Sequence, residues 1–573
     1  MLQQLYTVQG QQLSQTPWQV YPRPQMRRES YVNLNGHWDF TVSQQETLPE
    51  SYDKTIRVPF CPESLLSGIH THFSEGSYLW YRRSFTLPQD FNRGRVLLHI
   101  GAADQSLICY VNQKQVGKHI GGYDNITFDI TDYLLETNIL EFCCQDDLRD
   151  LSLPYGKQTM NRGGMWYTPV SGIWQTVWLE SVAEQYIQKL HITNRGYGVE
   201  IAIAPQLEGV IKVANLGEFP LTDGKAVIAP ENPHLWSPDD PYLYDFVIET
   251  PCDRVESYFA IRHLETKVIG SIPRLCLNGK PYFFHGLLDQ GYWPDGIYTP
   301  ASSDCYAEDI LAMKKLGFNT LRKHIKVEPE EFYYQCDKLG MLVFQDMVNN
   351  GDYNYLRDTV MPTVGVQKRK DKHLHKDPET REQFLASMTA TVNQLKNHPS
   401  IVYWTIFNEA WGQFDSDRVY RQFKQLDNTR FVDSTSGWFR QKESDVESLH
   451  IYFGPWSRLK PAEKPLVLSE FGGHTYAVAE HLFNPEKAYG YKTCKTLEAF
   501  QTSVEQLYRQ RILPAIPKGL CGTIYTQVSD VEDEINGLLT YDRKVCKVDE
   551  KTMRAIADAL YAAMDNSTAC PVP

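Results

Sequence analysis

The sequence predicts a multidomain chain: an N-terminal β-sandwich of the jelly-roll type, an immunoglobulin-like β-sandwich and a C-terminal (β/α)8 TIM barrel. Three observations support this. Short strand-like segments fill the first third, similar segments continue to about residue 262, and apolar strands then alternate with helix-like segments. At ~100–200 residues per domain, 573 residues allow three to five domains, or fewer with a large barrel. We place the boundaries at 1–183, 184–264 and 265–573.

The first sandwich is predicted from short segments that are rich in β-branched and aromatic residues. Turn residues such as Gly121-Gly122 and Asp124-Asn125 separate them, which is typical of antiparallel strands in a sandwich. The expected strands are Arg95–Ile100, Ser106–Val111, Ile126–Ile130, Ile139–Cys143 and Trp174–Leu179.

The second sandwich is predicted because further short strands follow and no long helical period interrupts them. Gly and Pro break the segments, and Asn232–Leu243 forms a Pro-rich turn before the last strand. A small immunoglobulin-like module fits this pattern. Its expected strands are Lys189–Thr193, Val199–Ala204, Gly209–Val213 and Tyr242–Thr250.

The barrel is predicted from eight strand candidates in roughly 290 residues, which matches a fold of typically ~250 residues. Several strands have solid apolar cores, as expected of parallel strands that are buried on both faces. The candidates are Tyr282–Leu288, Phe318–Lys323, Met341–Asp346, Ile401–Asn408, Arg430–Ser434, Ser448–Phe453, Pro465–Glu470 and Cys521–Gln527.

Helix patterns lie between most of these strands. In Cys305–Leu316, the residues Ala307, Ile310 and Leu311 are spaced to face the core, and Gly317 is a good C-terminal stop. The polar stretch Asn349–Lys376 is expected to be an extended loop after the third strand, on the face where barrel active sites form.

Composition excludes several classes of function. Hydrophobic residues make up 42% and charged residues 22%, so the chain can build real cores and is not mostly disordered. A net charge of −13 disfavours nucleic-acid binding, and no run approaches the ~20 apolar residues of a membrane span. The N-terminus has no signal-peptide pattern, and the 12 Cys include no CxxC, so we expect a cytoplasmic protein with reduced thiols.

Two carboxylates follow strands of the predicted barrel. Asn408-Glu409 ends the fourth strand and Ser469-Glu470 ends the seventh, and barrel active sites form at these carboxyl ends. One protonated and one ionised carboxyl at the same mouth are what glycoside hydrolysis requires. The alternative is that each Glu is a solvated strand terminus.

Longer motifs surround these residues. They are Phe407-Asn408-Glu409-Ala410-Trp411, Leu468-Ser469-Glu470-Phe471-Gly472-Gly473, Asn33-Leu34-Asn35-Gly36-His37-Trp38, Val58-Pro59-Phe60, Trp80-Tyr81-Arg82-Arg83, Ser171-Gly172-Ile173-Trp174-Gln175 and Leu277-Asn278-Gly279-Lys280. In this order, and with this order of domains, the chain resembles glycoside hydrolase family 2, which includes β-galactosidases, β-glucuronidases and β-mannosidases. The resemblance extends to about residue 565.

The resemblance implies roles for four residues. Glu409 would be the general acid/base and Glu470 the nucleophile of a retaining exo-β-glycosidase, with the carboxyls ~5–5.5 Å apart. Asn408 would hydrogen-bond the sugar 2-hydroxyl. Tyr452 would donate its hydroxyl to Glu470 and keep that carboxylate in place and ionised; the alternative is a packed aromatic with a hydrated hydroxyl.

Three further residues are substrate-binding candidates with open alternatives. His324 either contacts the substrate or the nucleophile, or lies buried behind them. Trp438 either stacks on the sugar ring or packs within its loop. Asp289 either binds hydroxyls or anchors its own loop. His373 and His375 lie in a Lys-rich polar loop, and no metal site or cofactor is expected.

The substrate is expected to be a small carbohydrate, an oligosaccharide or glycoside, and the leading candidate is a β-galactoside, so the expected activity is that of a β-galactosidase. The family's β-glucuronidases carry Asn-x-Lys after strand eight, where this chain reads Glu534-Ile535-Asn536-Gly537-Leu538. The Lys is absent and Asp530, Glu532 and Asp533 lie nearby, so a uronate is disfavoured. The usual Trp of strand eight is also replaced, in Ile524-Tyr525-Thr526-Gln527. The alternatives are β-galacturonidase, α-L-arabinosidase, β-mannosidase or β-glucuronidase activity, or a non-catalytic carbohydrate-binding relative. The resemblance also favours a homo-oligomer.

Overall fold

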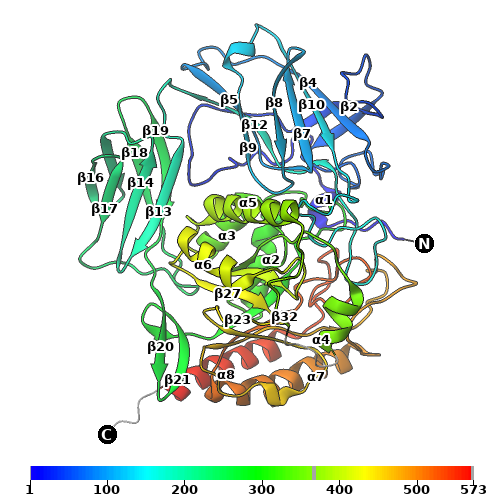
Figure 1. Cartoon of the computed structure of the whole chain (residues 1–573), viewed down its shortest axis with the longest axis vertical. Helices are drawn as coiled ribbons and strands as arrows, with labels where there is room; N and C mark the ends of the chain where they lie inside the picture. The colour runs from blue at the N-terminus through cyan, green and yellow to red at the C-terminus, as the bar shows by residue number, and fades with distance from the viewer. Residues whose placement is uncertain (1, 364–368, 569–573) are drawn as a thin grey trace.

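The computed structural model describes residues 2–363 and 369–568. Figure 1 shows antiparallel sheets of the first third at the top, a second set of antiparallel sheets at the left, and a parallel barrel with its helices below. The predicted fold class, two β-sandwiches followed by a TIM barrel, is therefore confirmed.

The first sandwich packs a four-stranded sheet, in the order β1-β12-β5-β9, against a six-stranded sheet, in the order β3-β2-β4-β10-β7-β8. Buried residues of both sheets, such as Trp38 and Leu98, form one core. The strands are β1 Tyr31–Asn33, β2 Gly36–Ser43, β3 Lys54–Val58, β4 Tyr78–Phe85, β5 Arg95–Ile100, β7 Ser106–Val111, β8 Lys114–Ile120, β9 Ile126–Asp129, β10 Asn138–Gln145 and β12 Val177–Val182, with a separate pair β6 Ala103–Asp104 and β11 Gly172–Ile173.

One predicted strand of this sandwich begins too early. The expected strand Trp174–Leu179 is in fact Val177–Val182. Trp174 instead donates its indole N–H to the Gly122 carbonyl and packs with the buried aromatics beneath the sandwich. The prediction was wrong because large aromatic residues are common in strands, whereas Trp174 lies at the contact between the sandwich and the barrel.

The second sandwich has sheets in the orders β13-β14-β17 and β16-β15-β18-β19. Alternation is clear in β14, where Val199, Ile201 and Ile203 are buried and the residues between them are not. The strands are β13 Lys189–Arg195, β14 Gly198–Ala204, β15 Gly209–Val213, β16 Gly217–Leu221, β17 Lys225–Ile228, β18 Tyr244–Glu249 and β19 Arg254–Phe259.

A small sheet of β20 (Leu264–Ile269), β21 (Ile272–Leu277) and β22 (Lys280–Pro281) follows and was not predicted. Its buried Arg274 donates to the carbonyls of Ile516 and Leu520, at the start of the last barrel strand. This sheet therefore closes the amino-terminal end of the barrel.

The barrel contains all eight predicted strands in parallel, in the order β27-β26-β25-β24-β23-β32-β29-β28. The strands are β23 Phe284–Asp289, β24 Thr320–Lys323, β25 Leu342–Asp346, β26 Ile401–Asn408, β27 Phe431–Ser436, β28 Glu447–Ile451, β29 Leu466–Gly472 and β32 Leu520–Thr526. The main helices are α2 Asp304–Lys315, α3 Glu330–Leu339, α5 Pro378–Leu395, α6 Ser416–Leu426, α7 Leu497–Leu507 and α8 Glu550–Thr568.

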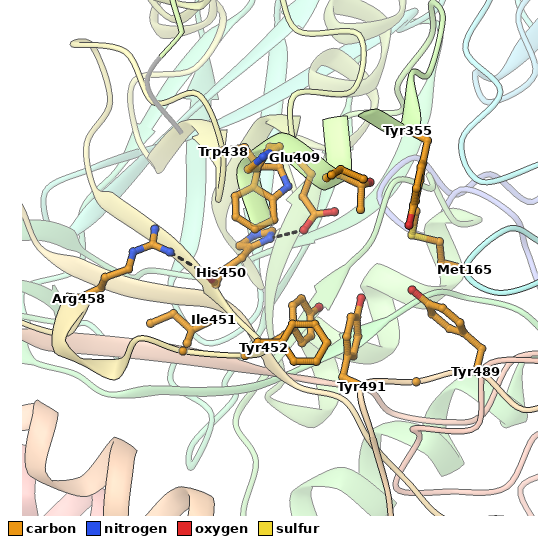
Figure 2. Close-up of a pocket in the computed structure, with 16 residues that line it drawn as sticks. Met165, Tyr355, Glu409, Trp438, His450, Ile451, Tyr452, Arg458, Tyr489 and Tyr491 are labelled. Carbon is orange, nitrogen blue, oxygen red and sulfur yellow. Dashed lines mark hydrogen bonds and ion pairs between the residues drawn. The ribbon is translucent and has the colours of Figure 1, made fainter. Parts of the chain in front are cut away.

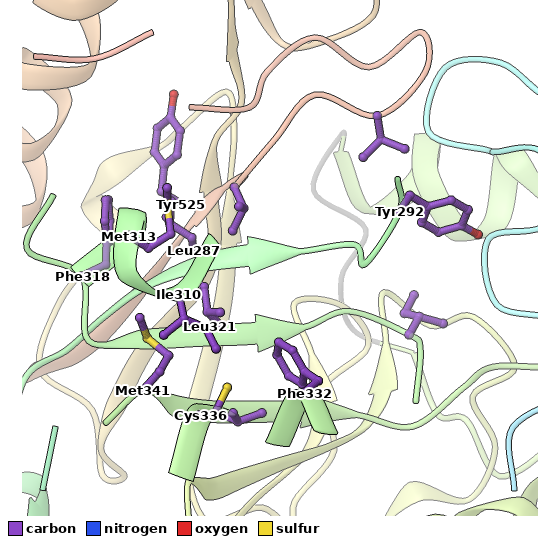
Figure 3. Packing of buried hydrophobic residues seen from close by; sticks show 14 of the residues in the cluster. Leu287, Tyr292, Ile310, Met313, Phe318, Leu321, Phe332, Cys336, Met341 and Tyr525 are labelled. Atoms are coloured by element: carbon purple, nitrogen blue, oxygen red, sulfur yellow. The ribbon is translucent and has the colours of Figure 1, made fainter. Parts of the chain in front are cut away.

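Helix α2 faces the barrel with a different side from the predicted one. Ile310 and Met313 pack against strand residues such as Leu287 and Leu321 (Figure 3), whereas Leu311 is 50% exposed. The buried positions Tyr306, Ile310 and Met313 follow the i, i+4, i+7 spacing, so the true stripe starts one residue before the predicted one.

The barrel has a seam between β27 and β28. Among the described residues no backbone ladder joins these two strands, and only a three-residue helical turn, Trp456–Arg458, lies between β28 and β29. Side chains close the seam instead: Nε2 of His450 lies 2.9 Å from Oγ of Ser436, and Oγ of Ser448 lies 3.5 Å from the same hydroxyl. A polar side-chain cluster thus replaces backbone hydrogen bonds beside the carboxyl ends of the strands.

Candidate active site

A cavity of about 340 Å³ opens at the carboxyl ends of the barrel strands (Figure 2). Its volume is at the lower end of the range that is usual for small-ligand sites. Four of its residues come from the predicted loop after β25; residues 364–368 of that loop lie outside the described residues. The lining is Met165, Tyr355, Thr359, Val360, Pro362, Glu409, Trp438, His450, Ile451, Tyr452, Phe453, Gly454, Arg458, Tyr489, Gly490 and Tyr491.

Glu409 leaves strand β26 through an unusual backbone turn. Its φ is +48° and that of Ala410 is +66°, both in the left-handed region that non-glycine residues seldom adopt. Such positions cost of order 1–3 kcal/mol each and occur at functional sites. The turn brings the carboxylate into the cavity, where Oε1 lies 2.8 Å from Nδ1 of His450.

Glu470 lies within β29 and is 4% exposed. The Tyr452 hydroxyl donates to its Oε2 at 2.6 Å, and Arg322 Nη1 donates to its Oε1 at 3.1 Å. Both oxygens therefore have a fixed donor, which orients the carboxylate.

The two carboxylates meet at His450. An oxygen of Glu409, Nδ1 of His450 and an oxygen of Glu470 all lie within 4.8 Å of one another. His450 Nδ1 is 3.6 Å from Oε2 of Glu470. The residues are thus close enough to act on the same bond of a bound molecule.

A buried charge network lies behind Glu470. Arg322, whose side chain is fully buried, donates to Asp346 and, at 2.8 Å, to Oδ1 of Asn408. Burial alone would raise the pKa of Asp346, but Arg322 and His324 hold it below its usual value. Burial, aided by the charge of Lys157, lowers the pKa of His324 to about 4, so His324 is neutral at pH 7.

In the side-chain amide of Asn408, the oxygen is hydrogen-bonded and the nitrogen has no partner among the described residues. Arg322 fixes its Oδ1, while its buried Nδ2 has no hydrogen-bond partner among the described residues. A buried amide N–H without a partner is costly, so this group is a donor prepared for a bound molecule.

The predicted site residues fall into two groups. Glu409, Trp438 and Tyr452 line the cavity. Glu470 and Asn408 are not among its lining residues: Glu470 accepts from the lining residue Tyr452, and Asn408 accepts from Arg322, which also donates to Glu470. The other two have partners inside the protein, and neither is among the described residues that line the cavity. Nδ1 of His324 lies 2.8 Å from Asp346, and Asp289 accepts from Lys323 at 2.7 Å and from the Gly291 N–H at 2.9 Å.

Sequence reasoning did not assign His450, Tyr491 or Met165 to the site. For His450 there was a signal, because Ser448, His450 and Tyr452 alternate and so project to one side of their strand. Tyr491, whose ring stacks on Tyr452 at 3.8 Å, and Met165, which comes from the segment before β11, had none. They reach the cavity only through the tertiary fold.

Two family models match this chain. One described as "Glycosyl hydrolases family 2, TIM barrel domain" matches residues 272–554, and one described as "Glycosyl hydrolases family 2" matches residues 184–262. The chain belongs to glycoside hydrolase family 2. The predicted family is thereby confirmed.

Curated proteins similar to this family 2 chain carry different activities in their names. A β-galactosidase of Thermoanaerobacter pseudethanolicus is 24% identical over 488 residues, which are 78% of this chain and 61% of that protein. A β-glucuronidase of Felis catus is 24% identical over 548 residues, 80% of each chain. Matches cover only 61%, 48% and 37% of the first three relatives' own lengths.

Solved structures share the fold. A β-D-glucuronidase from Dictyoglomus thermophilum has a TM-score of 0.72 at 18% identity and covers 94% of this chain and 98% of its own. A family 2 β-galacturonidase from Eisenbergiella tayi bound to galacturonate has a TM-score of 0.68 at 17% identity, with 95% and 99% covered. No helix in the described part of the chain is both long and apolar enough to cross a bilayer.

Cationic side chains offset most of the negative charge in the acidic stretch 530–534, which follows β32. Asp530 pairs with Lys547 at 2.7 Å, and Arg162 contacts Glu532 and Asp533 at 3.3 and 3.1 Å. The fourth carboxylate, Glu534, accepts from the Tyr167 hydroxyl and from Asn536 Nδ2. The expected repulsion of a uronate is therefore reduced, since three of the four carboxylates have cationic partners.

Lys157 is a buried cation near this family 2 site. It is 7% exposed, and among the described residues its ammonium has no hydrogen bond or ion pair. It lies 5.6 Å from the centre of the Tyr167 ring and 5.7 Å from that of Trp411, so aromatic faces stabilise it. A buried ammonium without a carboxylate partner can accept an anionic group of a ligand.

One group of side chains in the described part of the chain could hold a metal ion: Glu409, His450 and Glu470. These are the residues that the chemistry below uses. Of the loop histidines considered in the sequence, His375 pairs with Asp352 at 3.1 Å.

Proposed function

We propose that the protein is a retaining exo-β-glycosidase that cleaves terminal non-reducing β-linked sugars by double displacement. One observation carries the proposal: a carboxylate oxygen of Glu409, which lines the cavity, and one of Glu470, which accepts from the lining residue Tyr452, lie within 4.8 Å of each other. Retaining enzymes hold their carboxyls about 5–5.5 Å apart, whereas inverting enzymes need about 6.5–9.5 Å for an intervening water.

In the first step, a Glu470 oxygen forms a bond to the anomeric carbon while the bond to the leaving oxygen breaks. Glu409 gives its proton to that leaving oxygen. In the second step, Glu409 takes a proton from water, and the water oxygen replaces Glu470 at the anomeric carbon. Two inversions give net retention of configuration.

The neighbours of Glu470 support its role as nucleophile. Tyr452 and Arg322 each donate to one of its oxygens, so the attacking group does not have to be oriented by the substrate. We expect Nδ2 of Asn408, which has no partner among the described residues, to donate to the sugar 2-hydroxyl, a contact that strengthens in the transition state.

Among glycones, we place β-D-galactosides first. Curated relatives carry both the name β-galactosidase and the name β-glucuronidase, so the order rests on the neutral amides of Gln527 and Asn536, which hydrogen-bond to each other at 2.8 Å after the last barrel strand. We place β-hexuronides second, because the unpaired ammonium of Lys157 could bind a sugar carboxylate.

A panel of 4-nitrophenyl glycosides tests the proposal: β-D-galactoside, β-D-glucoside, β-D-mannoside, β-D-glucuronide, β-D-galacturonide and α-L-arabinoside. For a β-hexuronide, Lys157→Ala should raise KM by about 10-fold or more, the cost of one charge-assisted contact. For a β-D-galactoside, the same variant should change KM little.

The catalytic roles are tested on the best substrate of the panel. Glu470→Gln should lower kcat by about 10³-fold or more. Glu409→Ala should lose most on poor leaving groups, and azide should restore its turnover while forming a β-glycosyl azide. The control is Glu63→Gln, a buried carboxyl of the first sandwich whose pKa burial raises to about 7. Inversion of configuration by proton NMR, or full activity of either site variant, would contradict the proposal.

A further inference from the structure

The imidazole of His450 contacts three groups: the proposed catalytic carboxylates of Glu409 and Glu470 and the hydroxyl of Ser436. Nδ1 faces Glu409 at 2.8 Å (Figure 2). Nε2 faces the Ser436 hydroxyl at 2.9 Å, and the side chain is fully buried. The backbone makes room for the ring at Gly437, where φ is +85° and an added Cβ would lie 2.5 Å from the imidazole. The ring is therefore fitted into its site and cannot turn away.

The hydroxyls behind the ring fix which nitrogen carries a proton. Ser436 donates its single proton to Ser469 at 3.0 Å, and Ser469 donates to the Leu449 carbonyl at 3.2 Å. Ser436 can therefore only accept from His450, so Nε2 bears hydrogen. The contact of Nδ1 with Glu409 then needs one further proton, either on the carboxyl or on the imidazole.

We propose that His450 is a positioning residue that shares the catalytic proton with Glu409, so that the carboxyl and the imidazole act as one acid–base pair. This inference rests on the proposed function of Glu409. While the site waits, the proton lies in the hydrogen bond between Nδ1 and Oε1. When the glycosidic bond breaks, the proton leaves Glu409 for the leaving oxygen, and imidazole returns to its neutral form.

The second step reverses the transfer. The attacking water gives its proton to Glu409 as its oxygen bonds to the anomeric carbon, and that proton is again shared with Nδ1. Each turnover thus takes one proton from the pair and returns one, so no further reactant is needed.

Other charged groups around the ring are compatible with such a pair. Glu470 faces Nδ1 at 3.6 Å from β29, and Asp433 on β27 lies close enough to interact with the imidazole electrostatically. Burial raises the pKa of Asp433, although Ser448 and Arg322 oppose this. Arg458 Nη1 contacts the His450 carbonyl rather than the ring, at 3.5 Å. The ring nitrogen Nδ1 therefore faces the carboxylates of Glu409 and Glu470, whereas the cation of Arg458 contacts only the backbone.

Two substitutions separate proton sharing from packing. His450→Asn puts an amide near the position of Nδ1 and keeps a contact to Glu409, but it cannot hold the proton. His450→Gln puts an amide near Nε2 and keeps the contact to Ser436 alone. Each is assayed as kcat/KM against pH with the phenyl and the 2,4-dinitrophenyl glycoside of the sugar that the panel identifies.

The expected result is a change in the pH profile that depends on the leaving group. With the phenyl glycoside, the alkaline limb of His450→Asn should move to lower pH by more than about half a unit, because the pair loses one of the two groups that hold its proton. With the 2,4-dinitrophenyl glycoside, which needs little acid assistance, the limb should move by less than about half a unit. Ser436→Ala, which removes the acceptor for Nε2–H, should move the limb in the same direction by less.

The control is His234→Asn, an exposed imidazole on the second sandwich that contacts Asp240 at 2.5 Å, and its profile should equal the wild type. An unchanged alkaline limb in His450→Asn and Ser436→Ala, or equal losses on both substrates, would overturn the inference. If His450→Asn does not fold, Ser436→Ala decides alone. Loss of acid catalysis in Glu409→Ala, with unchanged limbs in these variants, would reject the shared proton and leave the proposed function standing.

Discussion

At the scale of single residues, the hydroxyl of Tyr452 donates a hydrogen bond to Glu470 at 2.6 Å and also lies 3.0 Å from the Thr526 hydroxyl. Burial, reinforced by the charge of Glu470, raises the pKa of Tyr452 well above its usual value, so the phenol keeps its proton. The residue is thus a permanent donor to the proposed nucleophile across the usable pH range.

Removing this hydroxyl should slow the chemical step. Tyr452→Phe is expected to lower kcat by about 10- to 100-fold, since a hydrogen bond to a charged group contributes about 1.5–3 kcal/mol. Steady-state kinetics with an aryl glycoside measures the loss. The matched control is Tyr508→Phe, a buried phenol with no hydrogen-bond partner in the described part of the chain, which should keep activity within about twofold. A wild-type rate in Tyr452→Phe would remove Tyr452 from the mechanism.

The open amide of Asn408 predicts a loss that depends on the substrate. Asn408→Ala should lower kcat/KM by about 100-fold on an ordinary glycoside, because a transition-state hydrogen bond is missing. On the matching 2-deoxy glycoside, the variant and the wild type should differ by less than about threefold. Equal losses on both substrates would show that Asn408 acts through packing and not through the 2-hydroxyl.

At the scale of elements, the outcome of sequence reading depended on regularity. Strands with an unbroken apolar run, such as Ile401–Asn408, and those with alternation, such as Gly209–Val213, were located within a residue or two. The sheet of β20 to β22 was missed because its residues alternate weakly, and in β20 two of the six residues are exposed and none is buried. The face of α2 was misplaced because Leu311 is apolar but exposed.

Buried histidines of the elements predict how stability depends on pH. His285 on β23 is enclosed by Phe318, Tyr508 and Tyr561, and burial lowers its pKa to about 3. The unfolded chain binds a proton at this position below about pH 6.5 and the folded chain does not. Stability should therefore be full above that pH and fall towards about pH 3, by about 1.4 kcal/mol per pH unit for each such group.

His285→Phe should flatten this dependence. Urea midpoints between pH 6.5 and 4.5 should fall less steeply in the variant than in the wild type. The same substitution at His234, whose side chain is 45% exposed, should leave the slope unchanged. Identical slopes for wild type and His285→Phe would show that the ring is already protonated in the folded chain.

At the scale of the whole molecule, the first third of the chain supplies part of the site. Thr168 N–H donates to Glu532 at 2.9 Å, Arg162 spans Glu532 and Asp533, and Met165 between them lines the cavity. Sequence reading identified the two carboxylates, because each follows a strand within a recognisable motif. It could not find Met165 or Lys157, since no local pattern tells which sandwich loop will reach the barrel.

Removing the contacts of Arg162 should lower the stability of the protein. Arg162→Gln leaves two buried carboxylates without their cation and should cost about 3 kcal/mol, as for other broken buried ion pairs. Arg149→Gln, an exposed pair with Asp147 in the same region, is the control and should change stability by less than about 0.5 kcal/mol. Thermal or urea unfolding measures both; equal effects would mean that the Arg162 contacts add nothing to stability.

Residues from two separate parts of the chain, the barrel and the segment before β11, meet at the cavity. Of the two proposed catalytic carboxylates, Glu470 lies on barrel strand β29 and Glu409 directly follows strand β26. Met165 belongs to a connecting segment of another domain, far earlier in the gene. A substitution in this segment can therefore reshape the cavity without touching the proposed catalytic carboxylates.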